Sequence, residues 1–180
     1  DRNELYRRLA MPTRRRRAPT LTHVDAARRP TMVDVGPKAI TLREACAEAV
    51  VTLPRVVSLA LRRNGQRTKK GPVFDTAIVA GVMAAKRTHE LIPFCHPLAI
   101  ERCKITIDEA RAGRILIRCE VAVHGRTGVE MEALTGATVA ALTIYDMTKA
   151  LSHDIEITGV RLIEKRGGRR DFSRARRARP

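Results

Sequence analysis

Four stretches of the chain alternate between apolar and polar residues, the pattern of a β-strand with one buried face. Residues 41–54 read TLREACAEAVVTLP, and the residues on one face of that strand are Ala45, Ala47, Ala49, Val51 and Leu53. Residues 102–108 and 114–125 also alternate, and the loop EARAG between them predicts two antiparallel strands. Residues 155–165, IEITGVRLIEK, predict a closing strand.

Helical patterns separate these strands. Pro54 suits the first turn of a short helix that runs to about Arg63. Residues 73–92 predict a longer helix that Pro93 ends. Its narrow stripe of small residues would let another element approach closely, and consists of Ala77, Ala80, Gly81 and Ala84. The segment RRNGQRTKKGP predicts a basic loop, and residues 128–152 predict a long apolar helix.

The order of these elements predicts the fold. If the short helix is set aside, the order is β-α-β-β-α-β, which predicts an α+β protein. We expect a ferredoxin-like sandwich, in which an antiparallel sheet packs on helices. A chain of 180 residues that is 44% hydrophobic is long enough for one well-cored domain.

The net charge of +16 is concentrated at the two ends of the chain. Residues 1–20 carry seven arginines against two acids, and residues 165–180 carry eight basic residues against one acid. We therefore predict a disordered basic tail at 1–20, a folded domain at 21–172 and a second basic tail at 173–180. Aromatic residues make up only 3% of the chain, so nucleic-acid binding by the tails would be weak and nonspecific.

The four cysteines form no CxxC pair, and no apolar segment near the start indicates secretion. These features favour a reducing compartment, the cytoplasm or, in a eukaryote, the mitochondrial matrix. No apolar run approaches the ~20 residues that span a bilayer. Phosphate-binding fingerprints of the P-loop and Rossmann types are absent from the sequence, and we expect neither a metal nor another cofactor.

Residues 91–98, LIPFCHPL, set a cysteine beside a histidine between two prolines. Structural zinc would need further Cys or His ligands at suitable spacing, and none recur. A cysteine nucleophile activated by its own neighbour is geometrically awkward. A packing role stays open, but we favour a loop that presents His96 to a ligand.

The long predicted helix carries charges in an apolar setting. Asp146 and Lys149 are three residues apart and share a face, and Glu132 lies within about 40° of Asp146 by helical geometry. A surface ion pair is the alternative reading. Apolar neighbours make Asp146 and Lys149 candidates for perturbed pKa values, as a proton-transfer pair requires. Further basic residues near the ends of predicted elements would suit a phosphate-rich ligand.

Several motifs together resemble the MoaC family. They are LTHVD, MVDVGPK, AAKRTHELIPFCHPL, TGVEMEALTGATVAALTIYDMTKA and RLIEKRGG, and they span about residues 21–172. The resemblance implies a lyase of molybdenum cofactor biosynthesis. Such an enzyme converts 3′,8-cyclo-7,8-dihydro-GTP to cyclic pyranopterin monophosphate and releases pyrophosphate. It also implies a homo-oligomer, a hexamer built as a trimer of dimers, with active sites at subunit boundaries.

The resemblance also implies roles for individual residues. The catalytic set is Asp146, Lys149 and Lys70. The substrate-binding set is Phe94, Cys95, His96, Glu130, Met131, Glu132, Lys86, Arg87 and Lys165. The chain departs from the family pattern at Arg28, Pro72, Ile78 and the segment GGRRDF. The rival hypothesis is a catalytically weakened protein that acts as a basic RNA-associated or scaffolding module.

Overall fold

The structure is a computed structural model that describes residues 29–110 and 113–174. The chain divides into two units, residues 1–33 and 34–180. In the first, the Thr31 hydroxyl donates a hydrogen bond to the Met32 carbonyl (3.4 Å). All helices and strands below belong to the second. The predicted tail at 1–20 lies outside the described residues, as do 175–180 of the other tail. No described helix is long and apolar enough to cross a membrane.

A five-stranded antiparallel sheet forms one layer of the second unit. In spatial order its strands are β4 (Arg102–Glu109), β5 (Arg114–Gly125), β1 (Thr41–Thr52), β6 (Glu156–Arg166) and β7 (Phe172–Ser173). The central strand β1 pairs with β5 along its whole length. With the short β7 set aside, this order confirms the predicted ferredoxin-like fold. β7 includes Ser173, the first residue of the predicted C-terminal tail.

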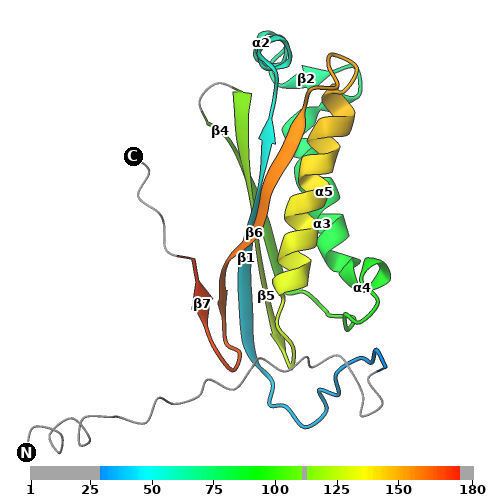
Figure 1. Cartoon of the computed structure of the whole chain (residues 1–180), viewed down its shortest axis with the longest axis vertical. Helices are drawn as coiled ribbons and strands as arrows, with labels where there is room; N and C mark the ends of the chain where they lie inside the picture. The colour runs from blue at the N-terminus through cyan, green and yellow to red at the C-terminus, as the bar shows by residue number, and fades with distance from the viewer. Residues whose placement is uncertain (1–28, 111–112, 175–180) are drawn as a thin grey trace, which may run out of the picture. The chain divides into compact units, whose positions relative to one another are not determined.

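The helices are α2 (Arg55–Arg63), α3 (Val73–Lys86), α4 (Thr88–Leu91) and α5 (Glu130–Thr148). Figure 1 shows α3 and α5 side by side on one face of the sheet. The residues predicted to face inward from β1 are all buried, and they share one core with buried residues of these helices. They join a core that includes Val57, Ile115, Ile117, Val121, Ala137 and Ile144.

Two glycines set the close approach of α3 to α5. A Cβ added at Gly81 would lie 2.4 Å from Ile105 Cδ1 and 2.7 Å from the Gly136 carbonyl oxygen. Side chains at this crossing would force the helices apart. The predicted stripe of small residues is therefore confirmed at Ala77 and Gly81, which are buried, whereas Ala80 and Ala84 are partly exposed.

Two local predictions were wrong. The single helix expected over 73–92 breaks at Arg87, whose φ of −110° and ψ of 17° are not helical, and α4 follows as a separate turn. The break brings Thr88 inside, where its hydroxyl donates to the Ala85 carbonyl (3.0 Å). The basic loop after α2 contains a small hairpin of β2 (Arg67–Thr68) and β3 (Gly71–Pro72).

The pairing of β1 with β6 is irregular. Its register shifts between Cys46 and Ala47 and again between Glu48 and Val50. Gly159, in β6 near Val50, has a φ of +62°, a conformation that favours glycine. β7 covers the outer edge of β6 only near Glu164 and Lys165.

Candidate active site

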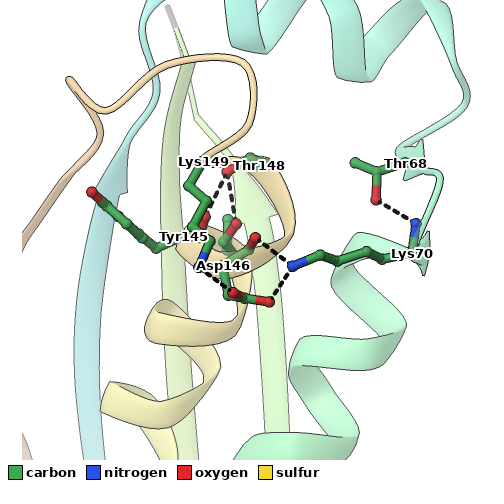
Figure 2. Close-up of polar contacts among 7 residues, drawn as sticks. Thr68, Lys70, Tyr145, Asp146, Thr148 and Lys149 are labelled. Carbon is green, nitrogen blue, oxygen red and sulfur yellow. Dashed lines mark hydrogen bonds and ion pairs between the residues drawn. The ribbon is translucent and has the colours of Figure 1, made fainter.

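The last turn of α5 carries the first cluster of charged residues. Lys149 Nζ lies 2.9 Å from Asp146 Oδ1, a contact between residues three apart on the helix. Lys70 Nζ lies 2.6 Å from Asp146 Oδ2 and donates to the Asp146 carbonyl oxygen at 3.0 Å. Figure 2 shows the carboxylate between the two lysines, with Lys70 reaching it from the β2–β3 hairpin. We call these three residues the Asp146 cluster.

Ion pairing fixes the charge states of this cluster. Hydrogen bonds from Lys70 and Lys149 lower the pKa of Asp146 to about 2. The hydrogen bond to Asp146, together with its negative charge, raises the pKa of Lys149. The side chains are about half exposed, 53% for Asp146 and 48% for Lys149. The cluster therefore presents a carboxylate and ammonium groups that a ligand can reach from solvent at neutral pH.

The local sequence explains how Lys70 reaches the helix end. Lys69 and Lys70 form the two-residue turn of the hairpin, since Thr68 pairs with Gly71. The Thr68 hydroxyl accepts a hydrogen bond from the Lys70 backbone N–H (3.2 Å), and Gly71 takes a φ of +119°. Lys70 and Asp146 are 76 residues apart in the sequence and belong to the same chain.

The first turn of α5 carries a second cluster. Glu132 is only 4% exposed, and desolvation by burial raises the pKa of its carboxyl group to about 7, with a further contribution from the charge of Glu130. Burial, and then the charge of Glu132, raises the pKa of the Cys95 thiol. Glu130 itself pairs with Lys165 Nζ at 2.7 Å. Met131, between the two acids, is exposed.

The segment between α4 and β4 lies at the same end of α5. Cys95 is half-buried, and a raised pKa makes its thiol a poor nucleophile at neutral pH. Phe94 is 39% exposed. His96 borders a groove of about 330 Å³, which is lined by Val35, Ile40, His96, Pro97, Leu98, Gly125, Arg126 and Thr127. The Thr127 hydroxyl in this groove is buried without a hydrogen-bond partner.

Lys86 and Arg87 lie where α3 ends. Both are exposed. The charge of Lys86 contributes to the lowered pKa of Cys103 on β4, after the larger effect of the Cys119 hydrogen bond. Among the described residues, no group of three or more His, Cys, Asp or Glu side chains could hold a metal ion.

The predicted site residues thus form two clusters rather than one. Glu132 and Asp146 are fourteen residues apart on α5, which at 1.5 Å per residue separates them by about 21 Å. Their similar angular position on the helix does not make them neighbours. Within one chain, the structure brings Lys70 to Asp146 and Cys95 to Glu132, and it keeps these two pairs apart.

Arg43 contacts two residues that line the groove beside His96, and the sequence patterns did not single it out. Its guanidinium donates to the carbonyl oxygens of Gly125 (3.2 Å) and Arg126 (3.5 Å). It also lies beside Gly168, where an added Cβ would be 3.2 Å from Arg43 Nη1. The alternation of β1 could have indicated this residue, because Arg43 lies on the same face of the strand as the buried residues Ala45 and Ala47.

The sequence model described as "MoaC family" matches residues 32–168. The chain belongs to the MoaC family. It is 58% identical over 165 residues to a "Cyclic pyranopterin monophosphate synthase" of Xanthomonas oryzae pv. oryzae (strain MAFF 311018), covering 92% of this chain and 99% of that protein. A protein of the same name from Methylobacterium sp. (strain 4-46) is 51% identical over 151 residues, covering 83% of this chain and 93% of that protein.

The departures from the family pattern have structural roles where they are described. Ile78 packs against the core from α3. Pro72 pairs with Arg67 and stands just before α3, a position where the missing N–H is tolerated. In the GGRRDF segment, the Gly167 backbone N–H donates to Asp171 Oδ1 (3.1 Å). Arg28 lies outside the described residues.

Proposed function

We propose that this chain is a lyase of molybdenum cofactor biosynthesis that converts 3′,8-cyclo-7,8-dihydro-GTP to cyclic pyranopterin monophosphate and pyrophosphate. The observation that carries the proposal is the Asp146 carboxylate held between Lys70 and Lys149 in a chain of the MoaC family. The names of the relatives agree with it. All four cysteines are free, which suits the reducing cytoplasm where we place the enzyme.

The charge states suggest a division of labour. Forming the cyclic phosphate joins a substrate hydroxyl oxygen to the α-phosphorus and breaks the bond to the leaving pyrophosphate. The ammonium groups of Lys70 and Lys149 would neutralise charge that develops on the phosphates, and Lys149 would supply protons to nitrogen during ring rebuilding. Asp146, with a pKa of about 2, stays ionised and fixes both lysines in place.

Glu132 is suited to the opposite task. A carboxyl group with a pKa of about 7 can accept a proton near neutral pH, as activation of the hydroxyl requires. Groups whose environments separate their pKa values commonly divide acid and base roles between them. We assign Phe94, His96 and Met131 to contacts with the rings of the substrate, and Lys165, Lys86 and Arg87 to its phosphates.

Because one chain holds these two clusters about 21 Å apart, we propose that each active site combines them from two copies. The outer surface of α3 and α5 exposes apolar side chains, which are Val79, Met83, Met131 and Leu142. A second copy packed there about a two-fold axis would bring the end of one α5 to the start of the other. Three such dimers would make the hexamer that the family resemblance implies.

The direct test incubates the protein with the cyclised dihydro-GTP and measures pyrophosphate release and pterin fluorescence after oxidation. Lys149→Ala and Lys70→Ala should each lower kcat by at least ~100-fold, the scale of losing a general acid or base. Substrate binding should change less. If either variant keeps more than about a third of wild-type turnover at saturating substrate, the role assigned to that lysine is wrong.

Mixing tests the shared site. Lys149→Ala and His96→Ala should each be nearly inactive, but chains of both kinds, unfolded and refolded together, should recover roughly a quarter of wild-type activity. Half of the randomly formed dimers contain one chain of each kind. In each of these mixed dimers one of the two sites is intact, so a quarter of all sites are active. A mixture no more active than its components would show that both clusters act within one chain.

A further inference from the structure

The hairpin that carries Lys70 has no buried side chain of its own. Between Leu61, near the end of α2, and Val73, at the start of α3, every residue is exposed or partly exposed. Burial of apolar side chains is the usual means by which a segment is held in place. Apart from the contacts of Lys70 with Asp146 itself, the hairpin is therefore held by polar contacts, and several of these lie at its base.

Gln66 forms the base of the hairpin and has an unusual backbone conformation. Its φ of 61° is in the left-handed region, which is uncommon for a residue with a side chain. Its N–H donates to the Leu61 carbonyl (2.8 Å) and its carbonyl accepts from the Val73 N–H (2.9 Å). Gln66 thus links Leu61 of α2 to Val73 of α3, and these two backbone hydrogen bonds close the base of the hairpin.

Glu109, the last residue of β4, holds the Gln66 side chain. Gln66 Nε2 donates to Glu109 Oε2 at 3.2 Å. The other carboxylate oxygen accepts from Arg62 Nε at 2.8 Å and from Ser58 Oγ at 3.5 Å, both on α2. The Glu109 side chain is 21% exposed, so these contacts are only partly open to water. We call Glu109, Gln66, Arg62 and Ser58 the Glu109 clamp.

We propose that Glu109 is a positioning residue for Lys70. Through Gln66 it ties the sheet and α2 to the base of the hairpin, and thereby places the Lys70 ammonium group against Asp146. The inference rests on the proposed function insofar as Lys70 serves the chemistry. Its geometric part, that the clamp sets the Lys70–Asp146 contact, stands independently.

The hairpin is short enough to transmit this constraint. Only three residues lie between Gln66 and Lys70, and the strand pairs Arg67–Pro72 and Thr68–Gly71 connect the base of the hairpin directly to its turn. Loss of the Glu109 contacts would let the exposed hairpin shift as a unit. A displacement of about 1 Å in a catalytic group can cost up to ~100-fold in rate, even when its cause lies away from the reacting atoms.

A double-mutant cycle separates positioning from a general structural role. In the presence of Lys70, Glu109→Ala should lower kcat about tenfold, with KM changed less than about threefold. In the Lys70→Ala background, the same change should lower kcat by less than about twofold, since the group it positions is gone. Gln66→Gly permits the left-handed backbone and removes the side-chain contact with Glu109, so it should repeat this pattern if Glu109→Ala fails to fold.

The matched control is Glu44→Ala. Glu44 also pairs with an arginine between two elements, Arg102 at 2.6 Å, but it contacts nothing in the hairpin. It should leave kcat close to wild type. Equal losses from Glu109→Ala in both backgrounds, or no loss in either, would overturn the proposal.

A second measurement does not depend on turnover. Reductive methylation with ¹³C-formaldehyde gives each lysine an NMR signal, and Lys70→Arg identifies the signal of Lys70. Glu109→Ala and Gln66→Gly should move that signal toward its position in Asp146→Asn, while Glu44→Ala should not. If the signal stays in place, the clamp does not set the contact. If it moves although the wild-type protein converts no substrate, the proposed function fails and the positioning stands.

Discussion

Glu132 places a carboxyl group inside the protein at the start of α5, and its burial should be visible in the pH dependence of stability. The pKa is raised from 4.5 to about 7, chiefly by desolvation. A group whose pKa is raised on folding contributes stability that is fully present below the unfolded value. That contribution is lost as pH rises through the folded value. The expected window is therefore about pH 4.5 to 7.

The magnitude follows from linkage. Each pKa unit corresponds to about 1.4 kcal/mol, so a displacement from 4.5 to about 7 couples at most about 3.5 kcal/mol to folding. Glu132→Gln removes the ionisation and keeps the shape of the side chain. Other titrating groups should cancel in the difference between the two proteins, except for Glu130 and Cys95, whose charges or pKa values are coupled to Glu132.

The assay is urea unfolding of both proteins from pH 5 to 9 at one fixed protein concentration, because the apparent stability of a protein that assembles depends on its concentration. The wild type should lose up to about 3 kcal/mol more than Glu132→Gln across this range. Glu130→Gln removes a charge that raises the pKa of Glu132 and should shift the loss to lower pH. Parallel stability curves for wild type and Glu132→Gln would refute the reasoning, since Glu132 would then ionise alike in both states.

Three further predictions concern single residues. Asp146→Asn should lower kcat nearly as much as Lys149→Ala, because both lysines lose the carboxylate that fixes them; kcat within about threefold of wild type would contradict this. Cys95→Ser should keep turnover well above that of Lys149→Ala, because the Cys95 thiol has a raised pKa; an equal loss would indicate nucleophilic catalysis. Gly81→Ala should lower the free energy of unfolding by about 1–3 kcal/mol, measured by urea unfolding, because its Cβ would overlap Ile105 and the Gly136 carbonyl; an unchanged value would mean that the helices separate freely.

Much of the fold could be predicted because most of its long strands place apolar residues at alternate positions. Period-two alternation over 41–54, 102–108 and 114–125 was enough to place β1, β4 and β5. The helix break at Arg87 was missed because no glycine or proline lies between Gly81 and Pro93 to mark it. The β2–β3 hairpin was missed because strands of two residues are too short to show a period.

The site was harder to predict than the fold. The pairing of Asp146 with Lys149 follows from helical spacing, but the arrival of Lys70 depends on a contact across 76 residues, and the family resemblance alone suggested it. Local spacing gave no indication that Glu132 would be buried and Asp146 exposed. The Glu109 clamp was also missed, because its members come from α2, the hairpin base and β4, and form no local motif.

The irregular pairing of β1 with β6 affects the tendency of the protein to aggregate at high concentration. A long, flat outer strand is a template on which another chain can add a strand and begin to aggregate. β6 is an outer strand along most of its length, since β7 covers it only near Glu164 and Lys165. The two register shifts and the left-handed Gly159 bend it away from a regular template. At the opposite edge, β4 carries Arg102, Lys104 and Asp108, whose charges resist pairing with an identical strand. Both borders of the sheet thus discourage uncontrolled strand addition.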